Sequence, residues 1–283
     1  MLRHSRLLLA ATAGALVLLQ FLPFTPLWSW FSDSSARAIA PGNEQFLRTW
    51  ERADRPIADG EAARTWMWGP KANSEVLLEP YLESPDGMRQ VQYFDKSRME
   101  ITHPHAPDDG LWYVTNGLLV VELVTGMLQV GDDTFIPYAP ADINVAGDSD
   151  DTGSPTYATM GSLRSAPPLV DGQLITQRVD RSGAVTDDPA LAVHGVTAAA
   201  HITVPGIDHQ VASPFLAFMQ SEGVVYVDGA FTHDRLFDSD YYATGWPITE
   251  AHWATVKVSG GWVDVLIQCF ERRCLTFTPS NPP

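Results

Sequence analysis

Two histidines placed two positions apart, His103 and His105, followed by Asp108, are the residues whose spacing best fits metal chemistry. On an extended chain alternate side chains point the same way, so both imidazoles can face one ion while a carboxylate completes the ligand set. His103, His105 and Asp108 are therefore the candidate metal ligands. The same stretch contains two prolines, and an ordinary polar loop is the interpretation that these residues favour.

Two aspartate clusters have the carboxylate density of a weak calcium site. They lie in residues 148–151 and 234–240. Neither has the glycine and distal glutamate of an EF-hand loop, so solvated acidic loops are the favoured interpretation. We therefore expect no cofactor, with weak structural calcium binding as the alternative.

Familiar catalytic motifs are missing from the sequence. It has no Gly-x-Ser-x-Gly elbow, His-Glu-x-x-His motif, phosphate-binding loop or dinucleotide fingerprint. Asp95 and Glu100 resemble the paired carboxylates of a glycosidase. In the second copy of the repeat described below, Glu271 matches Asp95 but Thr276 replaces Glu100, which favours a structural role. No catalytic residue is assigned, and the sequence favours a protein that is not an enzyme.

Nine tryptophans are many for a chain of 283 residues. Trp66 and Trp68 stand two positions apart in a predicted strand over residues 64–68, so their rings are expected on one face. Because aromatic faces stack on sugar rings, Trp66, Trp68 and Trp262 are the candidate residues of a glycan-binding platform. Core packing is the interpretation favoured for most of the tryptophans, since tryptophan is highly buried on average.

A stretch of the chain occurs twice, as residues 91–102 and 267–278, without a gap. Each copy alternates apolar and polar residues, breaks at a charged cluster and alternates again, which predicts a β-hairpin with a four-residue charged tip. Gln92 and Gln268 lie between apolar neighbours. We expect their amides to bind a neighbouring turn, in an architectural role.

Cys269 and Cys274 are the two cysteines of the chain, and they flank the tip of the second hairpin. Residues in these positions face each other across the strands, so we predict a disulfide. It closes a very short loop, and its entropic contribution is expected to be small. A pair of free buried thiols is the alternative.

The order of elements predicts a mainly β fold with a few short helices, a β-rich α+β class, in which two related halves each carry a Gln-x-Phe hairpin. A first helix is expected to start at Gly42-Asn43 and end before Pro56. Residues 118–124 favour a short helix capped by Thr115, and Ser213-Pro214 predicts another helix start.

Composition shifts divide the chain into an N-terminal segment, residues 1–38, and three further expected parts. Residues 39–140 and 207–283 are the two halves, and residues 141–206 connect them through a hairpin. Trp246-Pro247-Ile248 is aligned with Arg55-Pro56-Ile57, so each half would give a helix, a Pro-Ile turn, a strand and a hairpin. The second half stops soon after its hairpin, which leaves two interpretations open: the last strand or helix of this repeat is missing, or the half is truncated.

Residues 1–38 have the pattern of a secretory signal, in which Arg3 and Arg6 precede an apolar run over residues 7–22. Ala36-Arg37-Ala38 offers a cleavage site, but it lies far from the apolar run, so a single membrane anchor is the alternative. The protein is expected to be secreted or extracytoplasmic, or tethered to a membrane. Its formal net charge of −16 argues against nucleic acid as a partner.

Several motifs resemble a family of uncharacterised exported bacterial proteins. They lie in 66–70, 91–101, 115–119, 145–148, 245–253 and 265–282, and the resemblance covers nearly all of the expected mature chain. The Gln-x-Phe hairpin and its flanking turns are also similar to LGFP-type repeats, which implies association with the cell envelope. The tip glycine usual in those repeats is Ser97 in one copy and Arg273 in the other.

Two functions follow as hypotheses. The first is an exported, non-catalytic protein that binds a cell-envelope glycan or another surface polymer, and it predicts exposed tryptophans. The second is an exported hydrolase acting on glycan or peptidoglycan through a site assembled from distant loops. It predicts a pocket in which acidic or histidine side chains converge.

Overall fold

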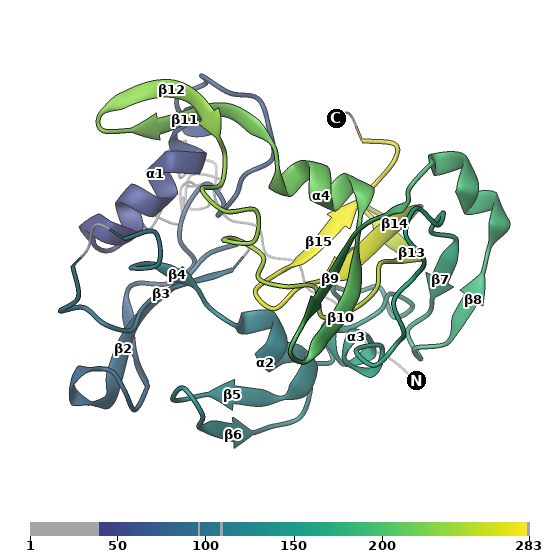
Figure 1. Cartoon of the computed structure of the whole chain (residues 1–283), viewed down its shortest axis with the longest axis horizontal. Helices are drawn as coiled ribbons and strands as arrows, with labels where there is room; N and C mark the ends of the chain where they lie inside the picture. The colour runs from purple at the N-terminus through teal and green to yellow at the C-terminus, as the bar shows by residue number, and fades with distance from the viewer. Residues whose placement is uncertain (1–39, 96, 108–109, 282–283) are drawn as a thin grey trace, which may run out of the picture. The chain divides into compact units, whose positions relative to one another are not determined.

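In the computed structural model both copies of the repeated stretch are β-hairpins (Figure 1). The first consists of β2 (Met88–Tyr93) and β3 (Arg98–Ile101), and the second of β14 (Gly261–Cys269) and β15 (Cys274–Phe277). Tyr93 lies opposite Arg98 just as Cys269 lies opposite Cys274. The predicted hairpins are therefore confirmed, and they have the same register.

The structure describes residues 40–95, 97–107 and 110–281, and the two hairpins belong to different sheets. One sheet has the order β1-β2-β3-β4, with β1 (Leu77–Pro80) and β4 (Thr115–Asn116). The other has the order β15-β14-β13-β7-β8, with β13 (His252–Val258), β7 (Gln177–Val179) and β8 (Val185–Asp187). β7 runs parallel to β13, which makes the connecting region part of the second sheet.

The remaining elements are short. Three two-stranded sheets pair β5 (Met127–Gln129) with β6 (Phe135–Pro137), β9 (Ala198–Val204) with β10 (Ile207–Ala212), and β11 (Glu222–Val227) with β12 (Ala230–Arg235). The α-helices are α1 (Glu44–Ala58), α2 (Leu119–Thr125), α3 (Tyr157–Ser162) and α4 (Ser213–Met219), and η2 (Pro85–Gly87) and η3 (Pro189–His194) are short 3-10 helices. The mainly β fold with a few short helices is thus confirmed.

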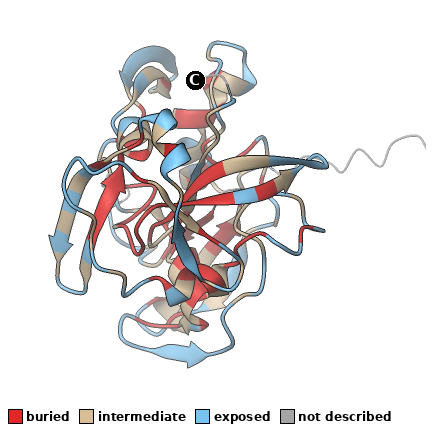
Figure 2. Ribbon diagram, turned by 90° about the vertical axis from the view of Figure 1, so that its right-hand side faces the viewer, coloured by how far each residue is buried: buried red, intermediate tan, exposed pale blue. Residues whose placement is uncertain are grey.

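Both faces of the five-stranded sheet are covered by hydrophobic side chains. Val265 and Ile267 pack with residues of α2 and α3, whereas Leu266 packs with Trp253 and residues of α4. Because successive side chains of a strand point to opposite faces, a strand buried on both sides needs a continuous apolar run. Strand β6, in contrast to the buried strands of this sheet, is exposed along its whole length and is pale blue near the bottom of Figure 2.

The Gln92 amide fastens the first hairpin to two preceding segments. Its Oε1 accepts a hydrogen bond from Gly42 N at 2.9 Å, just before α1. Its Nε2 donates to Ser74 O at 2.9 Å and to Ala40 O at 3.2 Å. The side chain is fully buried, so it takes the place of water for three backbone groups.

The Gln268 amide makes the matching contacts in the second hairpin. Its Oε1 accepts from Ala212 N at 3.1 Å, just before α4. Its Nε2 donates to Thr249 O at 3.0 Å and to Gln210 O at 2.5 Å. The architectural role predicted for both glutamines is confirmed, whereas a relation between the two halves over their full length stays a prediction.

A glycine lies against the acidic residue of each hairpin tip. Gly69 and Gly245 have φ angles of 112° and 68°. A Cβ on Gly69 would lie 2.8 Å from Cβ of Asp95, and one on Gly245 would lie 2.8 Å from Cβ of Glu271. Only a glycine combines these backbone angles with so close an approach.

The Pro-Ile motif aligns differently from the prediction. Pro247 forms a β-bridge with Phe270, and the bridge that corresponds to it in the first half joins Ala72 to Phe94. Trp246-Pro247-Ile248 therefore matches Lys71-Ala72-Asn73, and its alignment with Arg55-Pro56-Ile57 is wrong. Pro56 lies inside α1, which continues to Ala58 rather than ending before the proline.

Asp54 explains why residues 64–68 do not form the predicted strand. Its buried carboxylate accepts hydrogen bonds from the N–H groups of Met67, Trp68 and Gly69 at 2.7–3.0 Å. These donors are taken by a side chain of α1, so they are not available to a neighbouring strand. The same contacts hold the last turns of α1 against the core.

The two hairpin tips meet through Arg273. Its Nη2 donates to Ser97 Oγ at 2.8 Å, across 176 residues of sequence. Its Nη1 donates to Met67 O at 2.9 Å and its Nε to Ala243 O at 3.1 Å. Burial lowers the pKa of this guanidinium to about 10, although Asp54 partly opposes the shift. Arg273 is therefore a buried connection between the two sheets.

The predicted disulfide between Cys269 and Cys274 is present, and it closes the second hairpin. Helix α2 also lies where a helix was favoured, but its N-cap is Leu118, because Thr115 belongs to β4. All described residues fall in one compact unit spanning residues 38–283. The predicted signal or anchor segment lies outside the described residues, and no helix among those described is long and apolar enough to cross a membrane.

Candidate functional site

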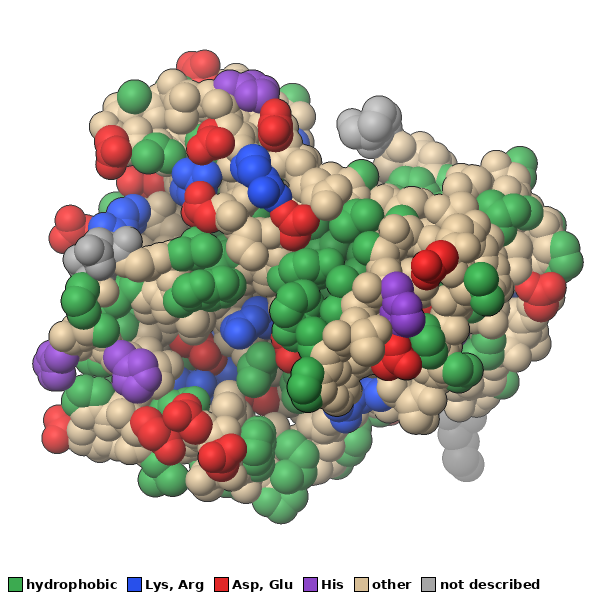
Figure 3. Space-filling model, in the orientation of Figure 1, with side chains coloured by type: hydrophobic (Ala, Val, Ile, Leu, Met, Phe, Trp, Pro, Cys, Tyr) green, Lys and Arg blue, Asp and Glu red, His purple; other side chains and the backbone are tan. Residues whose placement is uncertain are grey.

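A polar cleft of about 480 Å³ lies beside the first hairpin and reaches the tip of the second. Trp112 and Tyr81 contribute aromatic walls, and Glu100, Asp132 and Arg272 contribute charged groups. Figure 3 shows acidic and basic side chains side by side in the left half of that face. The cleft is the candidate site because it combines aromatic and charged side chains from distant segments.

Arg98 is the centre of the ion-pair network beside this cleft. It is 1% exposed. Its Nη1 and Nη2 bind Glu122 of α2 at 2.8 and 2.9 Å in a bidentate pair, and its Nε donates to Glu100 Oε1 at 2.6 Å. Burial opposes the charge, but the attraction of Glu100 and Glu122 outweighs it and raises the pKa of Arg98. The guanidinium is thus held rigidly in its charged form.

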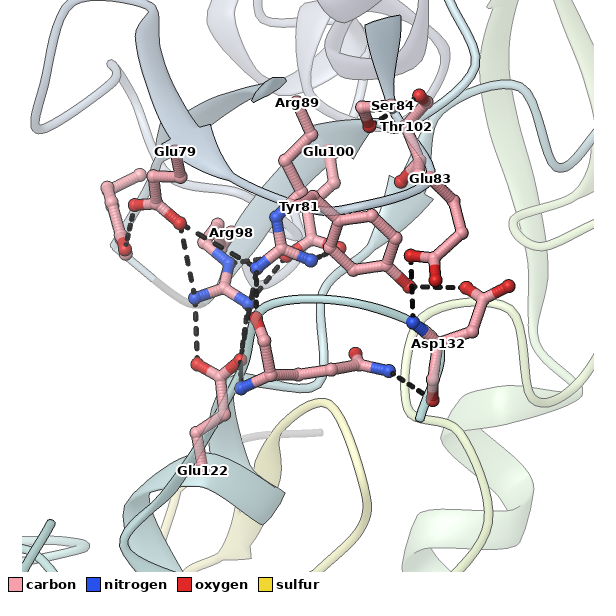
Figure 4. Close-up of polar contacts among 12 residues, drawn as sticks. Glu79, Tyr81, Glu83, Ser84, Arg89, Arg98, Glu100, Thr102, Glu122 and Asp132 are labelled. Atoms are coloured by element: carbon pink, nitrogen blue, oxygen red, sulfur yellow. Dashed lines mark hydrogen bonds and ion pairs between the residues drawn. The ribbon is translucent and has the colours of Figure 1, made fainter. Parts of the chain in front are cut away.

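Arg89 lies beside Arg98 and shares its carboxylates (Figure 4). Its Nη1 is 3.3 Å from Glu100 Oε2, and its Nη2 donates to Gln129 O at 3.3 Å. Its guanidinium also stacks over the ring of Tyr81 at 4.7 Å. Both oxygens of Glu100 are therefore bound by arginines, which holds this carboxylate in a fixed position.

Two tyrosines connect the network to its surroundings (Figure 4). Tyr93 donates to Glu79 Oε1 at 2.6 Å, and Tyr81 donates to Asp132 Oδ1 at 2.7 Å. Burial, together with the hydrogen bond to Asp132, raises the pKa of Tyr81. The phenols remain neutral donors, so they fix the positions of both carboxylates.

Trp112 forms the aromatic rim of the cleft. It is 54% exposed, and its ring centroid lies 5.5 Å from that of Tyr242. Tyr242 is itself held by a hydrogen bond from its hydroxyl to Val114 O at 2.7 Å. The exposed indole is therefore supported from behind by a fixed ring, which limits the entropy lost when a ligand stacks on it.

Arg272 enters the cleft from the second hairpin. Its backbone N–H donates to Thr244 O at 2.9 Å, and its side-chain stem passes close to Gly245. Among the described residues, its guanidinium has no hydrogen bond or ion pair. Burial lowers the pKa of Arg272, although Glu271 and Glu100 partly counter the effect. This cation lines the cleft without the hydrogen-bonding partners that Arg89 and Arg98 have.

A larger cavity of about 770 Å³ lies between α1 and the β11–β12 hairpin. Its walls are largely edges of the hydrophobic core, among them Met67, Trp68 and Phe237. At its rim Arg52 is paired with Asp238 at 3.0 Å. Its lining also includes charged side chains such as Glu51 and Asp228, but the smaller cleft lies beside the buried Arg98 network, so we place the candidate site there.

The predicted tryptophan platform is not assembled as one surface. Trp68 is 1% exposed and packs edge-on against Phe94, so the prediction that it offers a face to a glycan is wrong. Trp66 is partly buried and stacks on Trp50 with centroids 6.5 Å apart. Trp262, on β14, is 62% exposed and keeps an accessible ring.

The candidate metal ligands lie in a loop. His103 and His105 are both exposed, and His103 lines the cleft. Asp108 lies outside the described residues. No group of three or more metal-ligating side chains occurs within the described part of the chain.

The acidic cluster at 148–151 accepts hydrogen bonds from backbone N–H groups at the turn between β13 and β14. Asp148 accepts hydrogen bonds from the N–H groups of Ser259 and Gly260 at 3.0 and 2.9 Å. Burial opposes the charge of Asp151, but hydrogen bonds from Ser154, Lys257 N and other donors outweigh it and lower its pKa to about 2. These carboxylates are engaged in fixing the β13–β14 turn.

Sequence reasoning missed the residues that line the cleft best, Trp112 and Arg272. Trp112 follows a polar loop and has no periodic neighbours, so nothing in the sequence marks it as exposed. The sequence marks Arg272 only as part of a charged tip, because it does not show which of the two adjacent arginines, Arg272 or Arg273, is buried.

Comparison of the chain with protein-family models, curated proteins and solved structures finds no match. The resemblance to exported bacterial proteins therefore stays a prediction, and the function must be inferred from the cleft.

Proposed function

We propose that this protein is an exported, non-catalytic saccharide-binding protein of the cell envelope, and that the polar cleft is its binding site. The observation that supports this most directly is Trp112, 54% exposed at the cleft and backed by Tyr242. An indole face stacks on the C–H face of a sugar ring, and surrounding polar groups bind the hydroxyls.

The polar groups of the cleft suit such a ligand. Asp132 and Thr115 offer acceptors, and Arg272 and His103 offer donors. Arg98 and Arg89 fix Glu100, so this part of the cleft wall is held in place before a ligand arrives. Preorganised polar groups reduce the cost of binding a flexible polar ligand.

Export is supported by the disulfide between Cys269 and Cys274, because such bonds persist in oxidising compartments. The signal-like residues 1–38 point the same way. In this proposal the exported protein either loses residues 1–38 by cleavage or is tethered to the membrane by them.

Hydrolysis of glycan or peptidoglycan is the alternative, because two carboxylates, Glu100 and Asp132, line the cleft. A glycosidase needs one carboxyl group that can give up a proton and one that is free to attack or to activate water. Glu100 is bound by two arginines and Asp132 by Tyr81, which favours binding over hydrolysis.

The test is titration calorimetry of the full chain with neutral and acidic oligosaccharides, starting with chitotriose, cellotriose and trigalacturonate. We expect Trp112→Ala to weaken binding at least 10-fold, which is the scale of a lost stacking contact. Trp262→Ala is the matched control, because it removes the exposed tryptophan of β14.

Loss of binding in Trp262→Ala but not in Trp112→Ala would refute the cleft as the site. Chromatography of the same mixtures for shortened products distinguishes the alternative, since steady release of products would identify a hydrolase. Failure of every saccharide on the panel to bind would overturn the proposal.

A further inference from the structure

We propose that the cleft selects saccharides that carry a carboxylate, and that Arg272 is the residue that binds this group. The inference rests on the proposed saccharide-binding function and adds the class of ligand. Its basis is a guanidinium that lines the cleft and has no hydrogen-bond or ion-pair partner among the described residues.

The neighbouring arginines show how the partnered guanidinium groups are bound here. Arg98 makes three hydrogen bonds to carboxylates, and Arg89 binds Glu100, Gln129 O and the ring of Tyr81. Arg273, next to Arg272 in sequence, binds two backbone carbonyls and a hydroxyl. Arg272 differs from all three because no hydrogen bond or ion pair within the described part of the chain uses its guanidinium donors, so they can bind a group that enters the cleft.

Nearby carboxylates do not compensate Arg272 fully. Glu100 lines the same cleft, but its two oxygens are bound by Arg98 and Arg89. Burial lowers the pKa of Arg272 despite the attraction of Glu271 and Glu100, so the desolvation of its charge outweighs their help. A ligand acceptor in hydrogen-bond contact would restore what burial removes.

A carboxylate is the group that fits such a cation best. The planar fork of a guanidinium matches the two oxygens of a carboxylate in a bidentate pair. Ring stacking on Trp112 and a carboxylate on Arg272 together describe a uronic-acid type of sugar. Within the cleft Asp132 opposes an anion, whereas the charge of Glu100 is paired with Arg98 and Arg89. Salt screens the more distant negative charges of the protein beyond about 8–10 Å.

The experiment compares trigalacturonate with its methyl ester, which has the same rings and no charge. On the wild-type protein we expect the acid to bind about 10- to 100-fold more tightly than the ester, the range for a hydrogen bond to a charged group. Arg272→Gln should remove this preference and leave the binding of the ester unchanged. Arg272→Lys should restore it in part, because it keeps the charge and loses the fork.

Two further variants make the result specific. Arg164→Gln removes an exposed arginine elsewhere and should leave the preference intact. Trp112→Ala should weaken acid and ester alike. The preference should also fall as salt is raised from about 0.05 to 0.5 M, since the contact is ionic.

The outcomes separate the two proposals. If the ester binds as tightly as the acid, or Arg272→Gln keeps the preference, the inference fails while saccharide binding stands. If no saccharide of the panel binds the wild-type protein, the proposed function fails and takes this inference with it. A preference that disappears in Arg272→Gln and survives in Arg164→Gln supports it.

Discussion

Replacing Gln268 by methionine tests whether the buried amide of this residue holds the second hairpin in place. Methionine keeps nearly the same volume and removes both polar ends of the amide. The change leaves Ala212 N, Gln210 O and Thr249 O without their side-chain partner in a site that is fully buried. Each buried backbone group that loses its hydrogen bond costs about 1–3 kcal/mol.

We therefore expect Gln268→Met to lower the free energy of unfolding by about 3–5 kcal/mol, a large share of the ~5–15 kcal/mol typical of a domain. Gln92→Met should cost less, about 1–3 kcal/mol, because its three contacts are only partly buried. The measurement is urea unfolding followed by tryptophan fluorescence, with the midpoint compared at constant slope.

Gln90→Met is the matched control on the same strand as Gln92. Gln90 accepts one hydrogen bond, from Asn43 Nδ2 at 3.2 Å, and is partly exposed. Its replacement should cost less than about 1 kcal/mol. Should Gln268→Met be as stable as Gln90→Met, the amide contacts would not be what holds the second hairpin.

Three further predictions concern the disulfide, the ion network and pH. The double variant Cys269→Ser, Cys274→Ser should lose about 2 kcal/mol of unfolding free energy, the entropic value for so short a loop, and unreduced, unfolded wild-type protein should titrate no thiol. Glu122→Gln should cost about 3–5 kcal/mol, because it leaves Arg98 buried without its bidentate partner, and a loss below 1 kcal/mol would contradict this. Burial lowers the pKa of His252 below the usual histidine value of 6.5 despite Glu250, so the unfolded chain binds the proton more readily. Stability should thus fall as pH drops below about 6.5, and His252→Gln should show a flatter pH profile in the same urea assay.

The parts of the fold that the sequence predicted correctly depend on local patterns. The hairpins follow from alternation around a charged tip, and the disulfide follows from the positions of Cys269 and Cys274 in it. The glutamine contacts could be expected because each polar side chain stood between apolar ones. Each of these features is set by residues within one hairpin and its closest neighbours.

The errors depend on contacts between distant segments. Residues 64–68 alternate like a strand, but Asp54 takes the N–H groups that a strand would need. Pro56 predicts the end of a helix, but it is buried inside α1, which continues to Ala58. The glycan-platform hypothesis puts Trp68 on the surface, whereas Trp68 packs with Phe94 in the hydrophobic core. Local propensity was overruled by tertiary contacts in all three places.

Arg272 and Arg273 show how one hairpin tip can serve both architecture and binding. The two side chains are adjacent, and Arg273 is buried among Ser97, Met67 O and Ala243 O, where it joins the two sheets. Fixing Arg273 fixes the backbone of its neighbour, which turns Arg272 into the cleft. This guanidinium, which has no hydrogen bond or ion pair within the part of the chain that the structure describes, is therefore presented on a rigid support, and its position requires both hairpins. Substitution of Arg273 should then reduce stability and binding together, whereas substitution of Arg272 should change binding alone.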